Sequence, residues 1–338
     1  MPKILSIPAG QVFELVRGLF ESAGVAPDSA AGWAGVLVEN EQEGYSSHGI
    51  IRVQGYLNDI KLGIVTADAR PLVHNISALY TLVEGNKAVS IEVLTALRNL
   101  AGTISHDALP VHFVAVKNAH HLGRLATIAR LFCEEGYLVH GFENYNGLGQ
   151  KVMPEGAGRG RLATNPIVYG IPLAGGDPLV FDMTTSVVSE GKVRQHYLQK
   201  KPAAEGWLVD AKGNPVTDPA LFYADPMQAF LAPLGGTAMH KGFGLGLVSE
   251  ILASAFSGAG NVASPHPAEG NSAFFILYKV NIFGLGSNEV TERIKGICDY
   301  LTQGNESLHI PGTRKTKDKQ TIDVVEAVWN GLLNLEMP

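Results

Sequence analysis

Tyr45-Ser46-Ser47-His48-Gly49-Ile50-Ile51-Arg52 is the stretch on which the interpretation of this chain depends. His48 and Arg52 are four residues apart at a predicted helix start, with Ser46 or Ser47 as candidate cap, and this spacing puts both on one helical face. Histidine is the side chain best suited to move a proton near neutral pH, and arginine offers a fixed fork of donors that matches a carboxylate. The stretch indicates either a site for a small carboxylate and one proton, or a helix cap followed by a surface arginine.

The composition is that of a folded protein, with 46% hydrophobic and 17% charged residues, and 338 residues are long enough for two domains. The net charge is −6 and the densest basic run, 314–319, is short, so no nucleic-acid partner is predicted. The sequence has no run of about 18 apolar residues, so no membrane span is predicted. The N-terminus has no long apolar core, so no signal peptide is expected there. We therefore expect a cytoplasmic protein with no membrane partner, in which Cys133 and Cys298 are buried thiols.

Hydrophobic periodicity predicts helices at both ends of the chain and mixed strands and helices between them. The expected helices are 12–20, 27–44, 47–63, 87–100, 124–135, 241–256, 289–302 and 322–335. The expected strands are 78–83, 111–116, 137–142, 166–172, 178–182, 207–209 and 274–280. If the two helical ends pack together, the centre becomes an inserted domain.

The standard nucleotide, metal and nucleophile motifs are missing from the sequence. A dinucleotide fingerprint needs GxGxxG between a strand and a helix, and the glycines at 242–246 and 156–160 both fail it. Residues 190–193 lack the Ser or Thr of a phosphate-binding loop. His120 and His121 are adjacent and do not readily face one ion together, so no metal is predicted. A GxSxG elbow is absent, which removes sequence support for a hydrolase.

Polar residues stand at the ends of several predicted elements. Asn118-Ala119-His120-His121-Leu122-Gly123 and Asn144-Tyr145-Asn146 each follow a strand, and Thr164-Asn165-Pro166 opens one. Phe181 to Ser186 closes another, and His240-Lys241-Gly242 opens a helix, where N–H groups and the dipole favour anions. Each segment alone is explained as a turn or a cap. Together they indicate a binding site built at element ends.

In this order, and with Ser47-His48-Gly49, Arg52 and Pro311-Gly312, these segments, apart from 144–146, resemble the type 2 malate/L-lactate dehydrogenases. That family includes ureidoglycolate dehydrogenase, diketogulonate reductase, sulfolactate dehydrogenase and cyclic ketimine reductases, and the resemblance covers nearly the whole chain. It implies an α/β (α+β) fold with a non-Rossmann NAD(P)-binding domain, residues 76–284, built on a largely antiparallel sheet. Residues 1–75 with 285–338 are then a helical domain for the substrate and the dimer contact.

The resemblance also implies the activity and the site residues. The expected protein is a homodimeric oxidoreductase that moves a hydride between NAD(H) or NADP(H) and a small 2-oxo or 2-hydroxy carboxylate. His48 matches a proton donor of some members and His121 a proton acceptor of others. The implied substrate ligands are Arg52, Thr164 and Asn165. The implied cofactor ligands are Asn146, Phe181, Asp182, Met183, Thr184, His240, Lys241, Gly312, Thr313 and Arg314.

Two positions depart from the family pattern. Asn144-Tyr145-Asn146 replaces the more usual Thr-Asn-Ser, so a cofactor or substrate contact is expected to differ there. Thr313-Arg314 replaces a commoner acidic residue, and Arg314 either meets a 2′-phosphate, which favours NADP, or lies on the surface of a basic segment. The alternatives to a 2-oxo acid reductase are a cyclic ketimine (piperideine- or pyrroline-2-carboxylate) reductase and, in another class, a non-catalytic binding protein on this fold.

Overall fold

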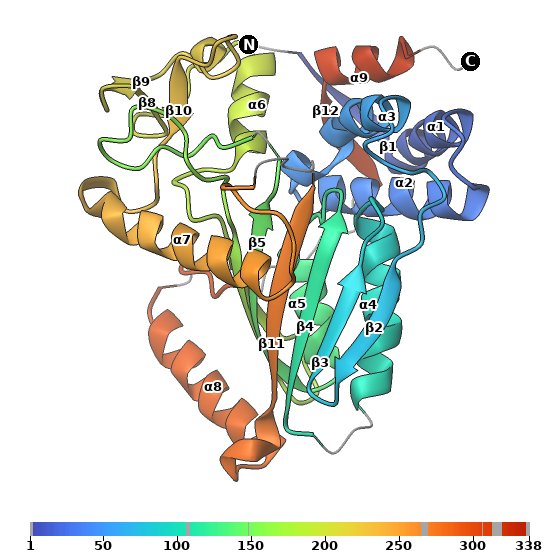
Figure 1. Ribbon diagram of the computed structural model, residues 1–338, viewed down its shortest axis with the longest axis vertical. Helices are drawn as coiled ribbons and strands as arrows, with labels where there is room; N and C mark the ends of the chain where they lie inside the picture. The colour runs from blue at the N-terminus through green and yellow to red at the C-terminus, as the bar shows by residue number, and fades with distance from the viewer. Residues whose placement is uncertain are drawn as a thin grey trace.

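The computed structural model of the chain describes residues 3–105, 109–147, 149–264, 270–305, 307–312 and 320–335 (Figure 1). These residues form a seven-stranded, a three-stranded and a two-stranded sheet, with helices around them. In this part of the chain, no helix is long and apolar enough to cross a membrane.

The seven-stranded sheet has the order β2-β3-β4-β11-β5-β6-β7, and only β3 and β4 pair in parallel. A mostly antiparallel sheet was predicted, and it differs from the parallel sheet of a Rossmann domain. Helices α4 and α5 cover one face of this sheet and α7 crosses the other (Figure 1). The bounds are β2 (Leu72–Ser77), β3 (Tyr80–Glu84), β4 (Val111–Ala119), β5 (Tyr137–Tyr145), β6 (Ile167–Ile171), β7 (Leu179–Met183), β11 (Asn271–Lys279), α4 (Ser90–Ser105), α5 (Leu125–Glu134) and α7 (Met239–Ala255).

The central strands are apolar because both of their faces are covered. Residues 271–275 of β11 are all buried, and Phe275 and Leu277 pack in one core with Phe132 of α5 and Leu97 of α4. Strands buried on both faces carry continuous apolar runs instead of alternating ones. Each such large side chain contributes about 1.5–3 kcal/mol when fully buried.

The two ends of the chain pack together, and they do so partly as a sheet. β1 (Ile4–Pro8) pairs antiparallel with β12 (Thr321–Val325), beside α1 (Ala9–Ser22), α2 (Pro27–Gln42), α3 (Val53–Lys61) and α9 (Glu326–Leu333). The helix predicted over 322–335 is therefore wrong in its first part. Ile322 and Val324 are buried and alternate with exposed neighbours, which is the period of a strand.

Helix α8 (Ser287–Thr302) lies at the opposite end of the molecule from α9 (Figure 1). Only Thr291 of this helix is buried, and its hydroxyl accepts a hydrogen bond from the Ala174 N–H at 2.8 Å. Cys298 on α8 is consequently half-buried, so the prediction of two buried thiols is wrong for it, whereas Cys133 is buried. The division into residues 1–75 with 285–338 and residues 76–284 stays a prediction.

The region between β7 and α7 contains a helix that the sequence did not reveal. α6 (Glu190–Leu198) precedes a small sheet of β8 (Leu208–Asp210), β9 (Pro215–Val216) and β10 (Ala229–Leu231). Only Gly191 and Val193 of α6 are buried, so the helix has no apolar stripe to predict it. Its first turn nevertheless contacts the His48 segment, as described below.

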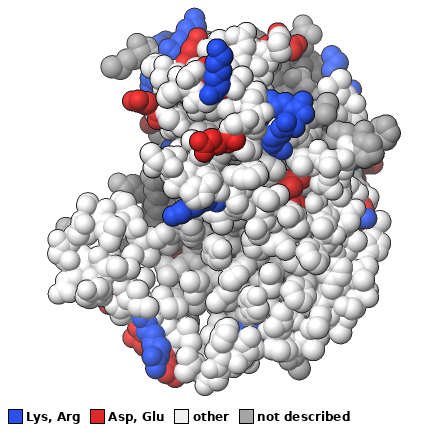
Figure 2. Space-filling view, turned by 60° about the vertical axis from the view of Figure 1, so that its left-hand side comes forward, with Lys and Arg blue, Asp and Glu red and all other residues white. Residues whose placement is uncertain are grey.

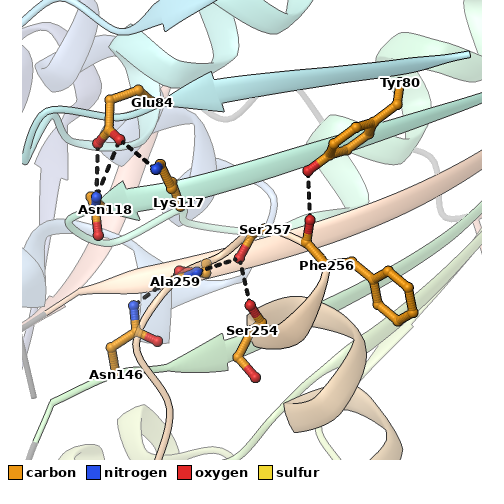
Figure 3. A network of polar contacts seen from close by, with 10 residues as sticks. Tyr80, Glu84, Lys117, Asn118, Asn146, Ser254, Phe256, Ser257 and Ala259 are labelled. Atoms are coloured by element: carbon orange, nitrogen blue, oxygen red, sulfur yellow. Dashed lines mark hydrogen bonds and ion pairs between the residues drawn. The ribbon is translucent and has the colours of Figure 1, made fainter. Parts of the chain in front are cut away.

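A group of polar contacts holds the ends of α7, β3 and β4 (Figure 3). The Tyr80 hydroxyl donates to the Phe256 carbonyl at 2.5 Å and so ties β3 to the end of α7. The Glu84 carboxylate accepts from the Asn118 amide at 3.0 Å and lies 3.3 Å from the Lys117 ammonium. These contacts fix the end of β4, from which the loop with His120 and His121 departs.

Candidate active site

Two adjoining cavities bring most of the predicted site residues together. The first has a volume of about 440 Å³, and its walls include His48, Arg52 and His121. The second, of about 870 Å³, is lined by the 181–184 segment and Gly312. Because they share wall residues, one long ligand with two ends can span both. The shared residues are His48, Arg124, Asp182, Thr184 and Ser189.

The 46–52 segment does not form the start of a single helix, as was predicted. Two short 3-10 turns, Ser46–His48 and Ile50–Arg52, are separated by Gly49, and α3 begins only at Val53. A Cβ on Gly49 would lie 2.1 Å from a carboxylate oxygen of Glu41, which accepts the N–H of the next residue at 3.0 Å. No side chain caps either turn. The histidine and the arginine still reach the same cavity.

His48 is a neutral base in the free protein. Its Nδ1 lies 3.0 Å from the Ser47 hydroxyl, and its carbonyl accepts from the Asn40 amide at 2.9 Å. Burial lowers the pKa of His48 to about 3, and the charges of Arg52 and Arg124 add to this effect. The imidazole is therefore uncharged at neutral pH and able to accept a proton.

His121 lies beside His48 in the wall of the first cavity. The two rings are stacked, with 5.7 Å between their centroids. The Nδ1 of His121 lies 2.5 Å from the Tyr56 hydroxyl, which fixes the ring. Burial, Arg52 and His48 hold the pKa of His121 well below its usual value, and burial raises the pKa of Tyr56 to about 12. Both groups are neutral at pH 7.

His120 has a different partner from its neighbour, since its Nε2 lies 2.8 Å from the Asp59 carboxylate. The two adjacent histidines thus each have their own hydrogen bond. Among the described residues, no group of three His, Cys, Asp or Glu side chains has the geometry of a metal site.

Arg52 is oriented by two contacts. Its Nε donates to the Ser47 carbonyl at 2.7 Å, and its Nη1 lies 3.6 Å from the Glu190 carboxylate. Glu190 also accepts from the Tyr223 hydroxyl at 2.8 Å and lies 3.9 Å from the Lys151 ammonium. Burial acts to raise the pKa of Glu190, but Arg52, Lys151 and the Tyr223 bond outweigh it and hold the pKa below its usual value. A negative Glu190 thus holds part of the guanidinium and leaves the rest for a ligand.

The other predicted residues divide into those on the cavity walls and those behind them. Thr164 lines the first cavity, and Asp182 and Thr184 line both. Asp182 accepts the Ala126 N–H at 2.9 Å, and burial raises its pKa. Phe181, Met183 and Gly312 line the second cavity.

Asn165 and Asn146 line neither cavity. The Asn165 amide donates to the Gly246 carbonyl at 3.0 Å and to the Glu250 carboxylate at 2.9 Å. The Asn146 amide, visible in Figure 3, donates to the Ser272 hydroxyl at 2.9 Å. Such bonds hold the strand ends that carry the cavity residues, and a direct ligand contact of either asparagine stays a prediction.

His240 and Lys241 are exposed in the first turn of α7 and are not part of either cavity wall. Thr313 and Arg314 lie outside the described residues, so the prediction that Arg314 meets a 2′-phosphate lies there too. The cofactor roles assigned to these four residues stay predictions.

Sequence reasoning missed several residues of the first cavity. Tyr56 and Asp59 continue the spacing of His48 and Arg52 along one helical face, and this signal was present in the sequence. The remaining residues carried no local signal, because segments distant in sequence bring them to the cavity. They are Arg124, Glu143, Lys151, Glu190 and Arg194.

Acidification is expected to destabilise the fold. An unfolded histidine takes up a proton below about pH 6.5, whereas folded His48 does so only near pH 3. The unfolded state therefore binds more protons in this window, and the free energy of unfolding falls by up to about 2 kcal/mol per such histidine from pH 7 to 5. Urea unfolding at both pH values measures the loss. The loss of unfolding free energy between pH 7 and 5 should be smaller in His48→Gln than in the wild type. In His74→Gln it should equal that of the wild type, because His74 is exposed. Equal losses in wild type and His48→Gln would contradict this assignment.

The comparisons with known proteins match this chain over nearly its whole length. The family model of malate/L-lactate dehydrogenase matches residues 7–333. The chain is 31% identical to Delta(1)-pyrroline-2-carboxylate/Delta(1)-piperideine-2-carboxylate reductase of Pseudomonas putida, over 98% of this chain and 97% of that one. It is 28% identical to (2R)-3-sulfolactate dehydrogenase (NADP(+)) of Chromohalobacter salexigens, over 98% of both. A dehydrogenase structure from Sinorhizobium meliloti superimposes with a TM-score of 0.81 at 26% identity, over 98% of both chains.

The mostly antiparallel central sheet and the whole-length match thus define a fold of NAD(P)-dependent oxidoreductases. The chain belongs to the malate/L-lactate dehydrogenase family, as the resemblance predicted.

Proposed function

We propose that the protein transfers a hydride between NADH or NADPH and a small 2-oxo or 2-hydroxy carboxylate of the malate/lactate type. The observation that carries this proposal is the pairing of His48 with Arg52 in the first cavity, which adjoins the larger second cavity, called the groove from here on. The groove suits a dinucleotide because it shares wall residues with the first cavity. Gly312 in its wall packs directly on β7, since a Cβ there would lie only 2.5 Å from the Val180 nitrogen.

The protein residues supply orientation and the proton. A nicotinamide bound there would give the hydride from its C4 atom in reduction and accept it at C4 in oxidation. Arg52 holds the substrate carboxylate with its free guanidinium N–H groups and fixes C2 within reach of the hydride. In oxidation, neutral His48 takes the hydroxyl proton. In reduction, the substrate carboxylate offsets the Arg52 charge, which removes one cause of the low pKa of His48 and His121 and favours their protonation.

A cyclic ketimine reductase is the second candidate, because the Pseudomonas putida relative bears that name. The same residues would serve this reaction, since a cyclic imine carboxylate offers a carboxylate to Arg52 and needs one proton. NADH and NADPH oxidation against pyruvate, oxaloacetate, sulfopyruvate, diketogulonate and piperideine-2-carboxylate separates the two. Fluorescence titration with NADH and NADPH tests whether the protein is a dehydrogenase or reductase at all. If it binds neither nucleotide, the non-catalytic binding protein is the remaining alternative.

We propose that the protein is a homodimer that uses the exposed face of α7. Leu245, Leu247, Val248 and Ile251 are between 38% and 48% exposed on this helix. The side of the molecule with α7 and α8 comes forward in Figure 2, where the lower part carries few charged side chains. An apolar area of this kind fits a second copy of the chain. Light scattering should give the dimer mass, and Val248→Glu with Ile251→Glu should give the monomer mass.

Gly191 is predicted to be essential for the position of Arg52. A Cβ at this first turn of α6 would lie 2.7 Å from the Ser47 Cβ and 3.1 Å from an Arg52 Nη. Gly191→Ala should therefore displace both groups and lower kcat/KM about tenfold, because a misplaced Arg52 no longer orients the carboxylate. The overpacking should also lower the free energy of unfolding by about 1–3 kcal/mol. Gly18→Ala is the control, because no atom lies within 4 Å of a Cβ there. Unchanged kcat/KM in Gly191→Ala would show that the cavity tolerates the shift.

A further inference from the structure

Glu143 is a buried carboxyl group in the wall of the first cavity with one oxygen left unpaired. It lies near the end of β5, its residue is 6% exposed, and it shares the cavity with His48 and Arg52. Its Oε1 accepts from the Asn271 amide at 2.9 Å. Its Oε2 has almost no surface open to solvent and has no hydrogen-bond partner among the described residues.

An unpaired oxygen of this kind is rare, because a buried polar atom without a partner loses its hydration for nothing in return. The surroundings of Glu143 favour the neutral acid, which can bury an unpaired oxygen at a lower cost than a carboxylate can. Burial raises the pKa of Glu143 well above its usual value, and the Asp182 charge adds to the effect. With Oε1 already an acceptor, the proton belongs on Oε2, which is then an unused donor.

The charged and titratable groups around Glu143 come from every neighbouring element. Asp182 lies on β7, and Glu250 lies on α7. Lys151 and Arg124 line the same cavity, and so do His120 and His121 after β4. None of these forms a hydrogen bond or ion pair with Oε2 in the described structure. Oε2 is thus a donor without a protein partner on a residue that lines the cavity, so a ligand that packs against this wall can supply the acceptor.

We propose that Glu143 is a specificity-determining residue whose carboxylic acid donates a hydrogen bond from Oε2 to a carbonyl or carboxylate oxygen of the molecule bound in this cavity. The inference rests on the proposed function, which supplies two such oxygens. One is the carboxamide oxygen of the nicotinamide, and the other belongs to the 2-oxo acid. Both offer the same acceptor chemistry, so the experiment distinguishes them.

Glu143→Gln and Glu143→Leu test the proposal together. Glutamine keeps an N–H donor in place of the acid but cannot ionise, whereas leucine removes the donor. We expect kcat/KM of the wild type to fall at alkaline pH, as Glu143 ionises and loses its proton. This alkaline limb should disappear in Glu143→Gln, and Glu143→Leu should lose about tenfold or more in kcat/KM, with the smaller loss in Glu143→Gln.

Binding measurements identify the acceptor. A weaker Kd for NADH and NADPH in Glu143→Leu, measured by fluorescence, assigns the bond to the carboxamide. An unchanged Kd with a raised KM assigns it to the substrate. Glu84→Gln is the matched control, since Glu84 is a carboxylate on the same sheet that pairs with Lys117 and lines neither cavity, and it should keep the alkaline limb.

A readout without turnover keeps the test independent of the proposed function. The infrared spectrum of the wild type alone, at neutral pH, should contain the C=O band of a protonated carboxylic acid that Glu143→Gln lacks. A missing difference band, or an alkaline limb that persists in Glu143→Gln, would overturn the inference even if the enzyme is active. Failure of the wild type to bind or oxidise NADH and NADPH, with the band present, would instead remove the proposed function.

Discussion

Replacement of His48 by asparagine is expected to lower kcat by about 10²–10⁴-fold and to leave the Kd for NADH or NADPH nearly unchanged. Asparagine keeps a polar side chain beside Ser47 but cannot carry a proton near neutral pH. The effect belongs to the chemical step, because His48 lines both cavities and so stands where the proposed substrate and nicotinamide would meet. Steady-state kinetics and nucleotide titration on the same preparation measure the two quantities.

His121 offers the internal alternative, since its ring is stacked on that of His48 at 5.7 Å. If His121 gives the proton, His121→Asn takes the large loss and His48→Asn the smaller one. His74→Asn is the matched control, because this histidine is exposed on β2, outside both cavities. Near-wild-type kcat in His48→Asn would remove His48 from the mechanism.

The sequence predicted the sheet better than it predicted the site. The apolar runs of β4, β5 and β11 are long because both sheet faces are covered. Each of these strands is therefore recognisable from its own local sequence. The break at Gly49 has no such signal, because it depends on a carboxylate of Glu41 on α2. α6 was missed for a similar reason, since only Gly191 and Val193 of this helix are buried and it has no apolar stripe.

The polar element ends show the limit of sequence reasoning within the site. Thr164 and Asn165 are adjacent and were both predicted to bind substrate, yet only Thr164 lines the cavity. Asn165 points to Glu250, a partner 85 residues away whose position only the fold determines. Glu143 was overlooked for the converse reason. A glutamate within a strand looks like a surface residue until the covering helix and the neighbouring strand are in place.

Arg52→Lys is expected to raise KM for the carboxylate substrate about 10–100-fold, with a smaller change in kcat. Lysine keeps the positive charge but presents one ammonium group in place of the fork, so a two-point contact with the carboxylate is lost. A charge-assisted hydrogen bond contributes about 1.5–3 kcal/mol, which corresponds to that range. Kinetics over a range of substrate concentrations measure it, with Arg17→Lys on the surface of α1 as control.

Comparison of Arg52→Lys with Arg52→Gln separates the effect of the guanidinium geometry from the effect of its charge. The Arg52 charge is one cause of the lowered pKa of both His48 and His121, and lysine retains a positive charge there while glutamine removes it. The acidic limb of the pH profile should therefore stay in place in Arg52→Lys and move to higher pH in Arg52→Gln, because the histidines protonate more easily. An unchanged KM in Arg52→Lys would mean that another cation, such as Lys151 or Arg194, holds the carboxylate. An unchanged acidic limb in Arg52→Gln would mean that burial and the other neighbouring charges keep the two histidines neutral without Arg52.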